Sequence, residues 1–139
     1  MSMFDIFNVA GSAISAQSQR LNVVASNLAN ADTVAGPDGK AYKAREVMFQ
    51  TVLMGQGEQP DASAGVRVST IQEDQSEGRR VYDPKHPGAD SDGYVTYSNV
   101  NAVEEMVNMI SASRSYQNNV EVMNTARSLL QKTLQMGQG

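Results

Sequence analysis

The chain has 139 residues, no cysteine, no tryptophan and a formal net charge of −4. This length predicts one compact domain, and a negative charge without a basic patch argues against nucleic acid as the main partner. The absence of cysteine excludes a disulfide framework, a thiolate nucleophile and any cysteine-based metal site. No run of about eighteen apolar residues occurs, so we expect no direct insertion into a membrane. The N-terminus does not resemble a secretory signal peptide, so we expect the protein to stay in the cytoplasm or to use another export route.

The first segment, up to about Ala31, predicts a helix of about two dozen residues because its apolar residues recur every seven positions. Asp5 is a candidate N-cap or first-turn acid. The heptad positions are Phe7, Ile14, Leu21 and Leu28, with Ala10, Gln17, Val24 and Ala31 between them.

The rest of this helix surface is small, polar and uncharged. Only Asp5 and Arg20 carry a charge before residue 32, whereas solvated helices usually carry many Glu and Lys residues. We therefore expect other subunits to surround the helix in its working state, since uncharged groups are buried at modest cost. The alternative is a soluble helical hairpin with an unusual surface. Because such a helix is marginal in isolation, we expect both termini to be partly disordered in the free monomer.

The middle of the chain, residues 32–97, has the short alternating runs and turn residues of a small antiparallel sheet or hairpin. With few large apolar residues, it depends on the helices or on partners for stability. The run from Val47 to Leu53 could instead be a short helix. The expected strands are Val47–Val52, Val66–Ile71, Arg80–Tyr82 and Tyr94–Tyr97, with turns at 36–39 and 55–65.

Residues 83–93 hold the densest cluster of functional groups, including the only histidine, His86. A divalent-metal site is conceivable here, but the calcium-loop template fails because Gly93 directly follows Asp92. Two prolines, Asp side chains and two glycines are typical of a structural turn, and we favour this interpretation. No nucleophile elbow or phosphate loop is visible elsewhere. We therefore predict no catalytic, cofactor-binding or metal-binding residues, no cofactor, and no enzyme activity.

The last segment, residues 101–136, predicts a helix about 50 Å long, which needs a partner helix alongside it. A second apolar line, Val103, Val107 and Ile110, lies beside the start of its heptad seam, where methionine is expected to pack. The seam runs through Ala102, Met106, Met109, Ser113, Tyr116, Val120, Met123, Arg127, Leu130 and Leu134.

Together these elements predict a mainly α fold with a small β region. The two terminal helices are expected to pair as an antiparallel coiled coil around a central hairpin or small sheet. The expected segments are 1–33, 34–98 and 99–139, with the first and third forming one helical domain. The candidate assembly interface comprises Ile14, Leu21, Asn27, Leu28, Asn30, Met109, Tyr116, Val120, Met123 and Leu130.

Several stretches resemble the flagellar axial family of rod, hook and hook-associated subunits. Residues 25–33, ASNLANADT, look like its "ANNLANxxT" signature, with Ser26 in place of the usual Asn. Residues 82–90, YDPKHPGAD, followed by Gly-Tyr-Val at 93–95, resemble a proximal rod subunit of that family, as do NVN at 99–101 and the helix from Val103 to Asn124. Ser98 stands where proline is more common. The resemblance covers nearly the whole chain in order.

The resemblance implies a structural subunit of the flagellar rod, which carries torque from the rotor toward the hook. The terminal helices would form the inner layer of a helical tube, and Asn27 and Asn30 would form hydrogen bonds where the first helix ends. The implied partners are other copies of the chain, other rod subunits, and the rotor-ring and export-gate proteins. The implied location is the periplasmic rod of the basal body, reached through the flagellar type III system without a cleaved signal. The alternative is a cytoplasmic coiled-coil adaptor that does not polymerise.

Overall fold

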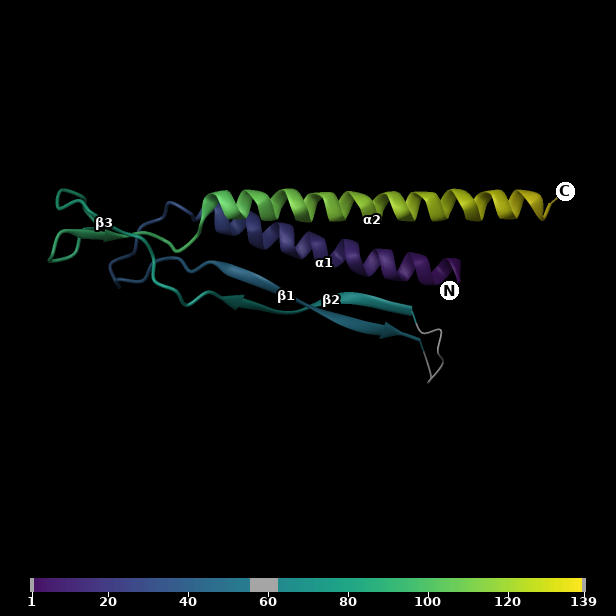
Figure 1. The fold of residues 1–139 in the computed structure, drawn as a ribbon, viewed down its shortest axis with the longest axis horizontal. Helices are drawn as coiled ribbons and strands as arrows, with labels where there is room; N and C mark the ends of the chain where they lie inside the picture. Colours follow the sequence, from purple (N-terminus) through teal and green to yellow (C-terminus); the bar gives the residue numbers. More distant parts are fainter. Residues whose placement is uncertain (1, 56–62, 139) are drawn as a thin grey trace.

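The computed structural model describes residues 2–55 and 63–138. Its two helices and the longer hairpin lie side by side along one direction and form an elongated stack. The helices are α1 (Met3–Ala29) and α2 (Ala102–Met136), and the four strands lie between them in sequence. In Figure 1, α1 lies between α2 and the hairpin of β1 (Arg45–Met54) and β2 (Ser63–Glu73). Both chain termini are at one end of the stack, so α1 and α2 run antiparallel.

Helix α1 begins with a capping box. The Ser2 hydroxyl accepts from the Asp5 N–H, and the Asp5 carboxylate accepts from the Ser2 N–H at 2.7 Å. The predicted first-turn role of Asp5 is therefore confirmed, and Ser2 is the N-cap. The buried side chains of α1 include Ala10, Ala16 and Val24, and α1 packs against both α2 and the hairpin.

Helix α2 begins as predicted, with the Asn101 side chain accepting from the N–H groups of Val103 and Glu104. Its buried face differs from the predicted seam by one position in each heptad. Ala112 and Ala126 are 0% and 3% exposed, whereas Met106 and Leu134 of the predicted seam are 54% and 60% exposed. Met106 and Leu134 are therefore largely uncovered within one chain, and the contact of these seam residues with neighbouring molecules stays a prediction.

The hairpin confirms the two longest predicted strands and excludes the alternative of a helix at residues 47–53. Its register shifts after Met48, where the extra residue Ser69 forms a bulge and donates to the Met48 carbonyl at 3.1 Å. The hairpin lies close to α1 at Gly65, where an added Cβ would lie 2.8 Å from the Ser12 hydroxyl oxygen. Next to it, the Val66 N–H donates to that same oxygen at 3.1 Å. The predicted loop at 55–65 is shorter, since β2 begins at Ser63; residues 56–62 lie outside the described part.

A second two-stranded sheet pairs β3 (Arg80–Tyr82) with β4 (Tyr94–Thr96). It projects from the end of the stack that is far from the start of α1 and the end of α2. The central segment thus forms two separate small sheets. Val95 in β4 is fully buried and is the centre of this unit. The segment before residue 36 joins it through a bridge between Val34 and Tyr97 and a hydrogen bond from the Ala35 N–H to the Thr96 carbonyl.

The alanine contact predicts a sharp difference between two Ala-to-Leu substitutions. We expect Ala112→Leu to lower the free energy of unfolding by about 1–3 kcal/mol, because the larger side chain cannot fit between the helices. Ala25→Leu, at an exposed position of α1, is the matched control and should change it little. Urea unfolding measures both; equal effects would show that α2 does not pack through Ala112.

Candidate functional site

The Asn27 side chain, 1% exposed, joins three separate segments at the C-terminal end of α1. Its Oδ1 accepts from the Arg45 N–H and from the Tyr42 hydroxyl, both at 3.0 Å. Its Nδ2 donates to the Arg45 carbonyl at 2.8 Å and to the Glu105 carboxylate at 3.0 Å. All four hydrogen-bonding positions of the amide are therefore used. We call these four residues, Asn27, Tyr42, Arg45 and Glu105, the Asn27 cluster.

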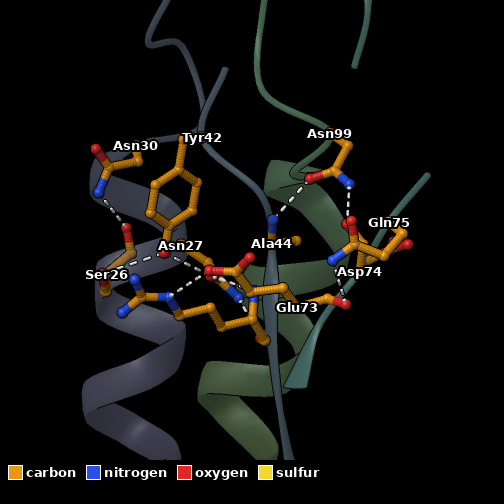
Figure 2. A network of polar contacts seen from close by, with 10 residues as sticks. Ser26, Asn27, Asn30, Tyr42, Ala44, Glu73, Asp74, Gln75 and Asn99 are labelled. Atoms are coloured by element: carbon orange, nitrogen blue, oxygen red, sulfur yellow. Dashed lines mark hydrogen bonds and ion pairs between the residues drawn. The ribbon is translucent and has the colours of Figure 1, made fainter. Parts of the chain in front are cut away.

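The amide takes the place of a neighbouring strand at the first residue of β1. It bonds both the N–H and the carbonyl of Arg45, as a β partner would. The Arg45 side chain also reaches across the hairpin, and its Nε lies 3.9 Å from the Glu73 carboxylate. Figure 2 shows Asn27, Tyr42 and Glu73 converging there. β1 therefore begins at a point held by α1, and the Glu105 contact adds α2.

A second asparagine, Asn99, ties the same end of the hairpin, where β1 begins and β2 ends, to the chain just before α2. Its Oδ1 accepts from the Ala44 N–H at 2.7 Å, and its Nδ2 donates to the carbonyls of Asp74 and Ser76 at 2.9 and 3.0 Å. Figure 2 shows this amide between the two strand ends. At this end of the hairpin, the start of β1 and the residue after β2 are thus fixed by two asparagine side chains, Asn27 from α1 and Asn99 from the chain just before α2.

Smaller polar contacts complete the end of α1. Asn30 donates to the Ser26 carbonyl at 2.9 Å, and the hydroxyls of Ser26 and Tyr42 lie 3.2 Å apart. Ser98, 3% exposed, donates from its hydroxyl to the Ala31 carbonyl at 2.7 Å and from its N–H to the Thr33 carbonyl at 3.2 Å. The predicted hydrogen bonds of Asn27 and Asn30 are confirmed, and the short side chain of Ser26 keeps a hydrogen-bonding role.

The apolar residues predicted for the assembly interface are half-buried in the single chain. They do not form one cluster, because they follow the whole length of the two helices. Their part in contacts between subunits stays a prediction, as does that of Asn27 and Asn30. These residues are Ile14, Leu21 and Leu28 on α1, and Met109, Tyr116, Val120, Met123 and Leu130 on α2.

The turn between β3 and β4 has its own internal hydrogen bonds. The Asp90 carboxylate accepts from the N–H groups of Asp92 and Tyr94 and pairs with Arg80 at 3.0 Å. His86 Nδ1 accepts from the Gly88 N–H at 2.9 Å. Gly93, with φ of 83°, supplies a backbone conformation that other residues rarely adopt. Across residues 2–55 and 63–138, no three His, Asp or Glu residues are grouped so that they could hold a metal.

Several residues in these contacts carry no local signal in the sequence. Tyr42 follows the turn at 36–39, and Glu105 lies near the start of the predicted last helix, so neither position points to a contact with Asn27. Asn99 belongs to the NVN stretch that resembles the family. Its partners Ala44 and Asp74 are 55 and 25 residues away along the chain, so no local pattern could have connected them.

The Asn27 cluster predicts that Asn27→Asp is strongly destabilising. The aspartate cannot donate to the Arg45 carbonyl, and it places a second carboxylate beside Glu105. We expect a loss of about 2–4 kcal/mol in the free energy of unfolding. Asn22→Asp, on the exposed side of the same helix, should have little effect. Urea unfolding at neutral pH compares the two; similar losses would contradict the assigned hydrogen bonds.

The turn predicts an acid-sensitive local structure. A hydrogen bond from the Tyr94 N–H lowers the pKa of Asp90 below its ordinary value of 3.8, and the Asp92 N–H and the Arg80 guanidinium lower this pKa further. Because the pKa of Asp90 is lower in the folded state, the ionised carboxylate stabilises the folded turn at any pH above the ordinary value of 3.8. This stabilisation is lost as the pH falls from that value through the lowered pKa. We expect Tyr94 amide exchange, corrected for intrinsic pH dependence, to show opening below about pH 3.8. Asp90→Asn should remove this dependence; an unchanged profile would contradict it.

The comparison with known proteins covers the whole length of the chain. Residues 7–37 match the family described as "Flagella basal body rod protein", and residues 91–136 match "Flagellar basal body rod FlgEFG protein C-terminal". The chain is 56% identical over 138 residues to the flagellar basal-body rod protein FlgC of Yersinia enterocolitica, covering 99% of this chain and 100% of that protein. It is 53% identical over 139 residues to FlgC of Salmonella typhimurium and 55% identical over 138 residues to FlgC of Escherichia coli O6:H1, with the same coverage. No helix within the described residues is long and apolar enough to span a membrane. The chain therefore belongs to the FlgC family of flagellar basal-body rod proteins.

Proposed function

We propose that this chain, a structural subunit of the basal-body rod, polymerises through the faces of its two helices that the single chain leaves uncovered. The observation that carries this proposal is an apolar surface at the start of α2. Val103, Met106, Val107 and Ile110 are 70%, 54%, 61% and 55% exposed. We call these four residues the outer face of α2.

The spacing of these residues places them together on one side of the helix. Positions i, i+3, i+4 and i+7 share one face of an α-helix. Ala112 lies about half a turn away from Val103 at 100° per residue, and it is fully buried toward α1. The outer face of α2 therefore points away from α1. Contiguous exposed apolar side chains of this kind mark interaction sites rather than solvated surface.

A stiff shaft is the natural product of such subunits. α1 is already covered by α2 on one side and by the hairpin on the other. When the outer face of α2 packs against the next subunit, rigid elements lie parallel throughout the assembly and share the load. A contact between two different surfaces does not end at a dimer, and when its rotation does not close a ring it extends along a helical axis.

Coiled-coil packing between helices and the division into domains belong to this proposal. Residues 1–33 and 99–139 would act as one helical domain, and residues 34–98 would make contacts further from the axis. The heptad residues of α1 and α2 that are half-buried in one chain would complete their packing in the assembly, as the predicted interface requires.

The same proposal includes the partners and the route to the rod. The partners are other copies of the chain, neighbouring rod subunits, and the rotor-ring and export-gate proteins. Export would use the flagellar type III apparatus without a cleaved signal. Secretion that stops when this apparatus is disabled supports the route, and retention as a cytoplasmic adaptor contradicts it.

Substitution of the outer face of α2 tests polymerisation without disturbing the fold. We expect Ile110→Asp, at a position 55% exposed, to preserve the urea midpoint of the purified chain and to abolish rod assembly and motility. A charge in an apolar contact costs several kcal/mol when it is buried. Asn118→Asp, at an exposed polar position of α2, is the control. Normal rods containing Ile110→Asp would overturn the assignment of this surface.

A further inference from the structure

We propose that the Asn27 amide transmits the pairing of α1 with α2 to the β1–β2 hairpin. In this view the hairpin packs fully onto α1 only when α2 is in place. The inference deepens the proposed function: its use in rod assembly rests on that function, although the coupling itself is a property of one chain.

The coupling begins at Glu105 in the first turn of α2. One carboxylate oxygen accepts from Asn27 Nδ2 at 3.0 Å, and the other accepts from Asn108 Nδ2 at 3.2 Å. The carboxylate is thus held by its own helix on one side while it bonds the amide on the other. Its neighbour Glu104 is exposed, and its part in the helix cap is its backbone N–H.

The Asn27 amide needs Glu105 to keep its orientation. With Glu105 present, one Nδ2 hydrogen goes to the carboxylate and the other to the Arg45 carbonyl, while Oδ1 faces the Arg45 N–H. Without Glu105, one Nδ2 hydrogen is left without a partner at a site that is 1% exposed. An unpaired donor is costly there, so the inward orientation of the amide loses stability relative to one that is turned toward solvent, and the amide turns outward more often. That rotation breaks both bonds to the peptide groups of Arg45.

The hairpin carries the effect to a distant point. Arg45 is the first residue of β1, and the same strand continues to Thr51, which pairs with Val66 of β2. Val66 in turn donates its N–H to the Ser12 hydroxyl at 3.1 Å. Ser12 and Asn27 are about 22 Å apart along α1 at the usual helical rise. The Val66 amide therefore reports hairpin packing far from the substituted residues.

Hydrogen exchange of the Val66 amide, measured by NMR on the full chain, tests the coupling. We expect exchange to accelerate about tenfold in Asn27→Ala and Glu105→Ala, the usual order for a lost buried hydrogen bond. Glu104→Ala is the matched control, since it removes the adjacent carboxylate from the same helical turn, and it should leave the rate within about twofold of the original chain. Glu105→Gln keeps an acceptor for Asn27 and should restore protection.

Exchange of the helix amides in the same spectra shows whether α1 and α2 stay folded while the Val66 amide is measured. Slow Val66 exchange in both alanine variants overturns the proposal, and so does equal acceleration by Glu104→Ala and Glu105→Ala. Fast Val66 exchange in the original chain with well-protected helices also overturns it. If Asn27→Ala does not fold, the comparison of Glu105→Ala with Glu105→Gln decides alone. Failure here, with Ile110→Asp still blocking assembly, removes the coupling and leaves the proposed function standing.

Discussion

The fold depends on one buried amide at the point where three elements meet. Asn27 is only 1% exposed, and both polar atoms of its side chain form hydrogen bonds within the protein. A buried amide with all its bonds made specifies one geometry, whereas the same amide with a missing partner would favour another. This constraint, together with the hydrogen bond from the Val66 N–H to the Ser12 hydroxyl, sets the direction of the hairpin along α1. An isolated two-stranded hairpin would be marginal in water.

The contact between the helices adds a second constraint of a different kind. Ala112 and Ala126 of α2, with Ala10 and Ala16 of α1, are almost completely buried. Small residues allow the helix backbones to approach closely, so the gain comes from dispersion contacts along a narrow seam rather than from large buried side chains. Several large apolar residues of α2, among them Val103, Val107 and Ile110, are left exposed. The helix pair within one chain is complete, yet it does not cover the apolar surface that the sequence supplies.

Local signals account for what the sequence predicts well. The two helices, the first-turn role of Asp5 and the strands each follow from patterns within a few residues: heptads, an acidic residue near a helix start, and alternating runs between turns. The one-position shift of the α2 face was not predictable by counting apolar residues, because that count gives weight to Met106 and little to Ala112. The Asn27 cluster and the Asn99 contacts join residues distant in the chain. The position of Asn27 near the end of the first helix predicts hydrogen bonds there, but it does not predict that Arg45 and Glu105 are the partners.

The same chain thus combines a precise internal geometry with an unfinished surface. Polar groups are used inside, where Asn27 and Asn99 fix the hairpin, and apolar groups remain outside, on the outer face of α2. A monomer working alone would gain from the opposite arrangement, since exposed apolar surface favours association in water. A subunit of the proposed shaft gains from this one: internal hydrogen bonds would set the directions of its helices and hairpin before assembly, and the outer face of α2 would then pack against a neighbouring subunit. Stiffness would follow because both kinds of contact resist bending along the same axis.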